Sequence, residues 1–221
     1  MHKALLITGA TGNQGRGVIN ALLASPRSIQ DYTILAVTRD PSSSLAKALI
    51  AKSSNTRLVQ GNLDDCPMIF QRATRELSSI STGDGKIWGV FSVQIPFGRG
   101  QSIESEERQS KSLVDTAIEH DVRHFVYASV DRRGDEPTYV PFFATKHRIE
   151  THLKERVAVV SAAATNEQEQ MTYTILRPTG FMENAKKDFQ SDNDITALKR
   201  KHPGLLSWED WIRKPENAFV Q

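Results

Sequence analysis

Three glycines near the start of the chain have the spacing of a phosphate-binding turn. The apolar run Ala4–Ile7 is typical of a buried parallel strand, and a helical pattern follows as far as Leu23. Between them lie Gly9, Gly12 and Gly15, spaced G-x-x-G-x-x-G. The first would allow a tight turn, the second a close approach of backbone to a pyrophosphate, and the third close packing of helix on strand. Because the N–H groups at the helix start would face the phosphates, this stretch favours a dinucleotide site over a glycine-rich turn without a ligand.

The residues that end the second predicted strand indicate which dinucleotide this site would take. Sites that prefer NAD usually carry an acidic residue there, which accepts hydrogen bonds from the ribose hydroxyls. Here Thr38 and Arg39 occupy that place, and a guanidinium can pair with a 2′-phosphate and stack on adenine. Lys47 could add charge, whereas Asp40 precedes Pro41 and a run of serines, which is typical of a turn into a helix. The pattern favours NADP(H) over NAD(H), the alternative being an ordinary surface arginine.

Strands and helices alternate along the chain that must position these residues. The predicted strands cover residues 4–7, 32–38, 57–60, 87–93, 123–128 and 172–177, and after the first helix the predicted helices cover residues 42–52, 67–79, 102–120 and 141–157. Residues 157–171 either extend the last helix or form a small edge strand, before a polar loop. This order predicts an α/β fold, a Rossmann-like doubly wound parallel sheet with helices on both faces. Ligands bind such sheets at the carboxyl ends of the strands, near the switch in strand order.

Composition limits the class of protein. The 221 residues suit one domain, and 38% hydrophobic and 24% charged residues are typical of soluble globular proteins. The net charge of +2 gives no strong attraction to nucleic acid, and no apolar run approaches the length that spans a membrane. Cys66 is the single cysteine, so we expect no internal disulfide and a reducing compartment, cytoplasmic or nuclear. The histidines and acidic residues show no spacing typical of metal ligands.

Two kinds of charged cluster are interpreted as solvated surface. The basic ones are Arg132-Arg133 and residues 199–202, which have no interleaved aromatic residues. The acidic one, Glu104 with Glu106 and Glu107, stands where a helix begins, and the helix dipole favours acidic residues there. We therefore expect no catalytic carboxylate in this cluster.

Four motifs, in order along the chain, carry a family resemblance. They are GATGNQG at residues 9–15, VTRDP at 37–41, GNLDD at 61–65 and LRPTGFMEN at 176–184. Together they resemble the NmrA-like family, atypical short-chain dehydrogenase/reductase proteins that are frequent in fungi, and residues 202–212 resemble that family's usual C-terminal ending. The resemblance covers nearly the whole chain. It implies a Rossmann-like fold, NADP(H) binding, and either reductase activity or redox sensing coupled to transcription.

Carried over position by position, the resemblance implies a set of cofactor-binding residues. It puts the pyrophosphate on Gly9, Ala10, Thr11, Gly12, Asn13 and Gln14, with Gly15 packing behind them, and the 2′-phosphate on Arg39. It puts the adenine beside Asn62 and Leu63, the nicotinamide ribose beside Val93, Gln94, Ile95 and Lys146, and the nicotinamide beside Pro178, Thr179, Gly180 and Phe181. Three of these apolar residues, Leu63, Val93 and Ile95, could equally belong to the core.

One position departs from the catalytic pattern of short-chain dehydrogenases. Members that reduce carbonyls use serine, tyrosine and lysine, with the tyrosine four residues before the lysine, whose ammonium eases loss of the tyrosine proton. Ser129 matches the serine and Lys146 the lysine, so these two are the candidate catalytic residues, but Phe142 stands at the tyrosine position. Tyr139 lies three residues further back, and we do not expect it to substitute. The NmrA-like family often lacks this tyrosine. The loss therefore argues against ordinary carbonyl reduction and leaves a hydride transfer that uses Lys146 or a substrate proton.

A second departure concerns the region after residue 184. The family normally continues there into a substrate-binding subdomain, whereas here residues 188–195 lead almost directly to the C-terminal motif. We expect one domain, residues 1–221, with a core at 1–184 and a helical remnant of a reduced substrate subdomain at 185–221.

Two functions fit these observations. One is an NADP(H)-dependent oxidoreductase acting on a small organic substrate. The other is a non-catalytic NADP(H)/NADP⁺ redox sensor that regulates a protein partner such as a transcription factor. The expected partners are a nicotinamide dinucleotide, a small-molecule substrate, and a protein partner or a second copy of the chain, with neither direct nucleic-acid binding nor a membrane. The missing tyrosine favours the sensor, and the cofactor motifs are neutral between the two.

Overall fold

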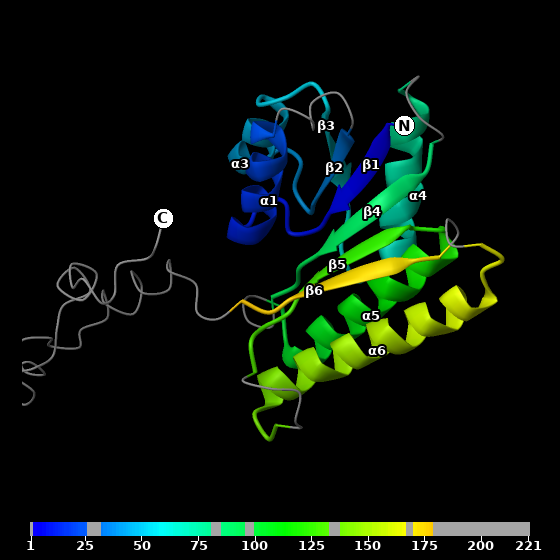
Figure 1. Ribbon diagram of the computed structural model, residues 1–221. Coiled ribbons are helices and arrows are strands. Elements are labelled where there is room, and N and C mark those ends of the chain that lie inside the picture. The colour runs from blue at the N-terminus through cyan, green and yellow to red at the C-terminus, as the bar shows by residue number, and fades with distance from the viewer. Residues whose placement is uncertain are drawn as a thin grey trace, which may run out of the picture. The chain divides into compact units, whose positions relative to one another are not determined.

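Six parallel strands form one sheet at the centre of the structure (Figure 1). The computed structural model describes residues 2–25, 32–80, 85–95, 100–132, 138–166 and 170–178, which lie within one unit, residues 1–179. The strands are β1 (Lys3–Ile7), β2 (Tyr32–Thr38), β3 (Thr56–Gln60), β4 (Ile87–Ser92), β5 (His124–Ala128) and β6 (Thr172–Leu176). Their order in the sheet is β3-β2-β1-β4-β5-β6, so the strand order switches between β1 and β4. The predicted Rossmann-like parallel sheet is confirmed.

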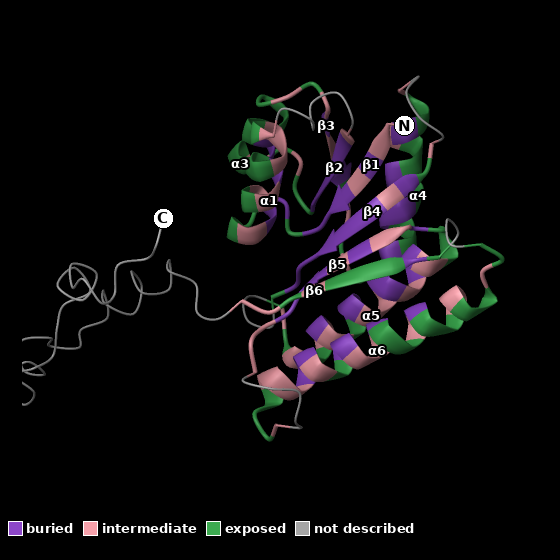
Figure 2. Cartoon of the chain, viewed as in Figure 1, coloured by how far each residue is buried: buried purple, intermediate pink, exposed green. Residues whose placement is uncertain are grey.

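Helices cover both faces of this sheet, as predicted (Figures 1 and 2). On one face α1 (Asn13–Ala24) and α3 (Ser44–Ile50) pack on a core cluster that includes Ile7, Ile34 and Phe91. On the other face α4 (Cys66–Ser78), α5 (Ile103–Glu119) and α6 (Pro141–Ala163) cover a larger cluster built around Leu6 and Phe125. Adjacent residues of a strand point to opposite faces, so the continuous apolar runs of the central strands supply both clusters.

An internal strand and an edge strand of the sheet differ in how far they are buried. Strand β2 is buried from Thr33 to Thr38 because it lies between β1 and β3 and under helices. Strand β6 pairs with β5 and is mostly exposed, with Tyr173 39% and Leu176 44% accessible. The strand predicted at residues 172–177 is therefore confirmed in position. It is less buried than β4 and β5.

The last helix resolves an alternative that the sequence left open. Helix α6 runs to Ala163, so residues 157–163 extend the helix and do not form an edge strand. The buried positions Ile149, Leu153 and Val157 recur every four residues along it, which keeps one stripe of the helix against α5 and the sheet. The predicted C-terminal remnant, residues 185–221, lies outside the described residues.

Candidate functional site

A buried threonine joins the two strands on either side of the switch point. Thr8 follows β1, and its backbone N–H donates to the carbonyl of Phe91 at 3.0 Å. Its hydroxyl accepts a hydrogen bond from the Val93 N–H at 2.8 Å and lies 3.2 Å from the Val93 carbonyl oxygen. The carboxyl ends of β1 and β4 are thereby held in register where the glycine turn begins.

The glycine turn depends on two close approaches that leave no room for a side chain. Gly9 has φ +58°, and a Cβ there would lie 2.7 Å from Cγ1 of Val93. A Cβ on Gly15 would lie 2.4 Å from the carbonyl oxygen of Gly9. The N–H of Gly12 donates to the same carbonyl at 2.9 Å and closes the turn. The absence of side chains at Gly9 and Gly15 thus allows the start of α1 to pack closely on the end of β1, as the spacing predicts.

The N-terminus of α1 has the electrostatic character of an anion site. Its N-cap, Gly12, supplies no side-chain cap, and the first turn has no acidic residue. By contrast Ser43, Asp65 and Ser102 cap α3, α4 and α5 with a side-chain oxygen. Arg16 also lies in this first turn, and its guanidinium donates to the Asn13 side chain at 3.1 Å. A cation is unfavourable beside the positive end of a helix dipole unless an anion joins it, so the turn is suited to a phosphate.

Two charged residues that follow β2, Arg39 and Asp40, have different surroundings. Arg39 is exposed and forms no ion pair or side-chain hydrogen bond within the described ranges. Asp40 accepts hydrogen bonds at Oδ1 from the backbone N–H and the hydroxyl of Ser42, at 2.9 and 2.6 Å, and these bonds hold its pKa below the usual value. The carboxylate of Asp40 therefore shapes the turn into α3, as expected, and the guanidinium of Arg39 is available to a ligand.

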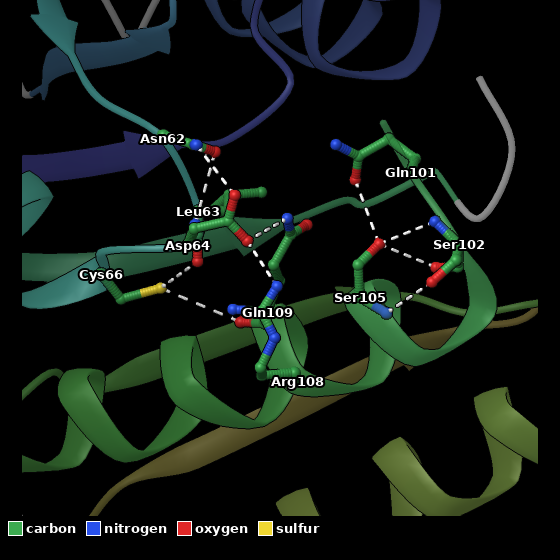
Figure 3. Close-up of polar contacts among 9 residues, drawn as sticks. All are labelled: Asn62, Leu63, Asp64, Cys66, Gln101, Ser102, Ser105, Arg108 and Gln109. Carbon is green, nitrogen blue, oxygen red and sulfur yellow. Dashed lines mark hydrogen bonds and ion pairs between the residues drawn. The ribbon is translucent and has the colours of Figure 1, made fainter. Parts of the chain in front are cut away.

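The loop after β3 is fastened to α5 by a polar cluster (Figure 3). The side-chain amide of Asn62 donates to Asp64 at 2.9 Å, and Asp64 in turn accepts from Arg108 at 2.7 Å and Gln109 at 2.9 Å. Cys66, the first residue of α4, donates its thiol to the Leu63 carbonyl at 3.3 Å. Hydrogen bonding from Gln109 holds the pKa of Asp64 below its usual value, outweighing burial. Both predicted adenine neighbours, Asn62 and Leu63, thus sit on an anchored loop.

Three consecutive residues predicted beside the nicotinamide ribose, Val93, Gln94 and Ile95, differ in exposure. Val93 is 8% exposed and packs in the cluster with Phe91 and Ala10, so the core interpretation holds for it in this structure. Gln94 is 5% exposed, and its side-chain amide donates to the Ser92 hydroxyl at 3.0 Å. Ile95 is 58% exposed and does not belong to the core. Of Val93, Gln94 and Ile95, Ile95 is the one that presents an apolar side chain to solvent.

The predicted serine is bound to a buried carboxylate. Ser129 donates its hydroxyl to Oε1 of Glu150 at 2.5 Å, and both residues are buried. Arg177 makes two bonds to the same carboxylate, at 3.1 and 2.6 Å, and Arg132 makes an ion pair at 3.3 Å. Burial alone would raise the pKa of Glu150, but the hydrogen bonds from Arg177 and Ser129 and the two guanidinium charges lower it. The cluster joins the ends of β5 and β6 to α6.

The predicted lysine has a carboxylate partner as well. The ammonium of Lys146 lies 2.7 Å from Oε1 of Glu106, an ion pair between α6 and α5 with both side chains at most 5% exposed. It also donates to the carbonyl of Ala128, the last residue of β5, at 3.3 Å. Lys146 and Ser129 therefore meet at the carboxyl end of β5, as the resemblance implies.

The structure offers no substitute for the missing tyrosine among its described residues. The ring of Phe142 lies 5.8 Å from the Lys146 ammonium and has no acidic proton. Tyr139 is fully exposed. Tyr127 is near Lys146, but its side chain is completely buried under α5 and α6, and burial raises the pKa of its phenol well above 10. At the nicotinamide side, Pro178 is described, and Thr179, Gly180 and Phe181 lie outside the described residues.

The prediction that the charged clusters are solvated is wrong for one residue in each of two clusters, Glu106 and Arg132. Glu106 is fully buried, although Glu104 is exposed as expected. The Arg132 side chain is 1% exposed because it pairs with Glu150, and Arg133 lies outside the described residues. A helical count could have found the first error, since Glu106 stands in line with the buried Gln109 at i+3 and Leu113 at i+7. Nothing comparable signals Arg132, whose partner is 18 residues away.

Within the described ranges, no three His, Cys, Asp or Glu residues lie close enough together to hold a metal ion. No helix in that part of the chain has both the length and the apolar character needed to cross a membrane.

Comparisons with known proteins agree with the resemblance. The sequence model of the NmrA-like family matches residues 1–198. A curated relative, the NmrA-like family domain-containing oxidoreductase ptmS of Penicillium ochrochloron, is 30% identical over 129 residues, which are 58% of this chain and 34% of that protein.

Two solved structures share the fold. NmrA, a negative transcriptional regulator in complex with NADP, is 20% identical with a TM-score of 0.53, covering 79% of this chain and 44% of that one. The NADPH-dependent quinone oxidoreductase QOR2 of Escherichia coli, complexed with NADPH, is 21% identical with a TM-score of 0.54, covering 83% of this chain and 52% of that one. The chain spans about a third of the length of the curated relative and about half of these structures.

Proposed function

Because this chain belongs to the NmrA-like family, we propose that it binds NADP(H) at the carboxyl ends of its central strands and acts as an NADP(H)-dependent oxidoreductase on a small organic substrate. The observation that carries the proposal is the turn from β1 into α1. There Gly15 packs on Gly9 without room for a Cβ, and the helix begins with neither a side-chain cap nor an acidic residue. Such a helix start presents backbone N–H groups and the positive end of its dipole to phosphates.

The other residues at this edge fit the rest of a dinucleotide. Residues 9–14 would hold the diphosphate, and the exposed guanidinium of Arg39, which pairs with no described residue, would take a 2′-phosphate. The loop of Asn62 and Leu63, anchored to α5, would flank the adenine. Val93, Gln94 and Ile95 would border the nicotinamide ribose, and Pro178 with Thr179, Gly180 and Phe181 would border the nicotinamide. A bound nicotinamide would supply the hydride chemistry.

The candidate catalytic residues have restricted roles in this proposal. Lys146 would orient the nicotinamide ribose from the end of β5, where Glu106 and the Ala128 carbonyl hold its ammonium. The hydroxyl hydrogen of Ser129 is already given to Glu150, so Ser129 would act toward a substrate as a hydrogen-bond acceptor. Neither residue resembles the proton-donating tyrosine of carbonyl reductases.

A second function, an NADP(H)/NADP⁺ sensor that regulates a protein partner, is favoured by Phe142. That residue stands where a proton donor would be needed, and its ring faces Lys146. The structural neighbour NmrA is described as a negative transcriptional regulator, and it was solved with NADP bound. Binding of one redox form of the coenzyme would then shift the affinity for the partner without turnover.

One set of titrations tests the proposal. Dissociation constants for NADP⁺, NADPH, NAD⁺ and NADH are measured by calorimetry for the wild-type chain, for Arg39→Ala and for Arg75→Ala, an exposed control on α4. A charge-assisted pair is worth about 1.5–3 kcal/mol. Arg39→Ala should therefore weaken NADP⁺ binding roughly 10- to 150-fold and NAD⁺ binding much less, and Arg75→Ala should change neither.

The same samples separate the two functions. Oxidation of NADPH above background with a panel of carbonyls and enones would support the enzyme, and tight binding without turnover would support the sensor. Equal losses of NADP⁺ and NAD⁺ affinity in Arg39→Ala would contradict the role of Arg39. No heat from any of the four coenzymes with folded wild-type protein would refute both functions.

A further inference from the structure

The buried ion pair between Glu106 and Lys146 stands at a helix contact where apolar side chains would also pack. It joins the first turn of α5 to the first half of α6, with an Nζ–Oε1 distance of 2.7 Å and side-chain exposures of 0% and 5%. Within the described ranges neither carboxylate oxygen of Glu106 makes a hydrogen bond of good geometry, so the contact with Lys146 is an ion pair. Removing two charges from water is costly, and apolar residues of similar volume usually pack two helices as well or better. Among the described residues Lys146 is the cation paired with this carboxylate, so its retention here points to a purpose at Lys146.

The surroundings of Lys146 fix the direction of its ammonium. An ammonium has three N–H donors. The ammonium of Lys146 donates one hydrogen bond to the carbonyl of Ala128, at 3.3 Å, where β5 ends, and it forms the ion pair with Glu106. The rings of Tyr127 and Phe142 lie on its flanks, with their centroids 5.2 and 5.8 Å from Nζ. The hydrogen bond to Ala128 and the ion pair with Glu106 thus hold the ammonium, and an N–H remains for a ligand at the carboxyl end of the sheet.

We propose that Glu106 is a positioning residue for the dinucleotide site: it holds the Lys146 ammonium at the end of β5 so that the remaining N–H is directed to the ribose hydroxyls of the bound coenzyme. This inference rests on the proposed function. Without the carboxylate, the long lysine side chain would have to be ordered by the coenzyme itself, and that ordering would reduce affinity.

The charges around the pair make it sensitive to acid. Burial raises the pKa of Glu106, and the nearby Lys146 charge opposes that rise. Two other ionisable groups are packed near it. Burial raises the pKa of Tyr127 on β5, further from neutral pH. The charge of Glu150 on α6 is paired with Arg132 and Arg177. On α5 the neighbouring Glu107 faces Lys111 and Arg148. Of the acids near Lys146, Glu106 is the one whose pKa is raised toward neutral pH.

The test compares Glu106→Gln with Glu104→Gln, which changes an exposed carboxylate two residues away on the same helix turn. Calorimetry gives the dissociation constant of NADP⁺ for the full chain between pH 5 and pH 8, and thermal unfolding checks the fold of each variant. Glu106→Gln should weaken NADP⁺ binding about tenfold at pH 8, the value of one fixed charge-assisted donor, while Glu104→Gln should match the wild type. Glu106→Asp retains the charge and should recover part of the loss.

Two further readouts distinguish positioning from a structural role. In a Lys146→Met background, Glu106→Gln should cause no additional loss of affinity, because the group it positions is gone. As the pH falls, NADP⁺ binding by the wild type should weaken more than binding by Glu106→Gln. The coenzyme's 2′-phosphate takes up a proton near pH 6 in both proteins, so only the difference between them reports Glu106.

The outcomes separate the inference from the proposed function. If folded wild-type protein binds no nicotinamide coenzyme, the proposed function is refuted and this inference with it. If the wild type binds NADP⁺ and Glu106→Gln binds it equally well with the same pH profile, the inference alone is overturned. If Glu106→Gln does not fold, Glu106→Asp and the wild-type pH profile decide, and an affinity unchanged in both would also overturn it.

Discussion

Replacing Gly15 by alanine should damage the coenzyme site while replacing Gly17 should not. Both glycines lie in α1, and alanine is the better helix former by about 1 kcal/mol at either position. Around Gly17 a Cβ would meet nothing within 4 Å. At Gly15 it would lie 2.4 Å from the carbonyl oxygen of Gly9, 2.7 Å from the carbonyl carbon of that residue and 2.9 Å from the Cα of Ala10. The two variants therefore differ in contact and share the same gain in helix propensity.

The magnitude follows from how far the backbone must move. All three atoms near Gly15 belong to backbone, so no side chain can rotate away, and ordinary contact requires 3.4 Å or more. The start of α1 must shift by about 1 Å, at an overpacking cost of about 1–3 kcal/mol. After the gain in helix propensity, Gly15→Ala should lose about 0–2 kcal/mol of unfolding free energy, and Gly17→Ala should gain up to about 1 kcal/mol. A shift of that size in the phosphate-binding N–H groups should weaken NADP⁺ binding at least tenfold, since donors must lie within hydrogen-bond distance.

Urea unfolding and calorimetry with NADP⁺ would measure both variants beside the wild type. The expected pattern is a weak or absent binding signal for Gly15→Ala in a folded protein, and unchanged binding with higher stability for Gly17→Ala. If Gly15→Ala binds NADP⁺ as tightly as the wild type, the start of α1 does not hold the diphosphate. If both variants lose affinity equally, the effect comes from the helix as a whole and not from the close approach to Gly9.

Two more predictions concern other buried groups. Glu150→Gln should cost about 3 kcal/mol of unfolding free energy at pH 7, because it removes the buried negative charge that pairs with two guanidinium groups. The pKa of Glu150 is held below its ordinary value of 4.5, so its contribution is complete above pH 4.5 and is lost as the pH falls through the folded-state pKa. Urea unfolding from pH 7 downward should therefore show the wild type and the variant converging in acid, and a constant difference would contradict this account. Burial raises the pKa of Cys66 to about 11, so a thiol reagent at pH 8 should modify the native chain far more slowly than the chain in urea, and equal rates would contradict the burial.

The fold could be predicted from the sequence because its central strands, such as β2 and β4, are buried on both faces. Runs such as residues 32–38 contain almost only apolar residues and threonine, and glycine or proline marks where they end. The alternation of such runs with helical patterns leaves few arrangements other than a doubly wound sheet. The extension of α6 to Ala163 was left open because alanine and valine are compatible with both a helix and a strand.

The candidate site was predictable where it depends on backbone and not where it depends on pairs of distant charges. The roles of Gly9 and Gly15 follow from close contacts between neighbouring segments, which their spacing already encodes. Glu106, by contrast, meets its partner Lys146 only after α5 and α6 have packed together, and its residue type alone favours a solvated position. Its position in line with the buried residues of α5 indicates that Glu106 is buried. The preference of acidic residues for helix starts favoured the opposite interpretation.

The cluster around Glu150 joins residues that are synthesised at different times. Its partner Arg177 follows it by 27 residues, and ribosomes add about 5–20 residues each second. A nascent chain therefore carries this acid for roughly one to five seconds before its second guanidinium has been made. The buried carboxylate has both of its guanidinium partners only once β6 and Arg177 have been synthesised and the strand has paired with β5.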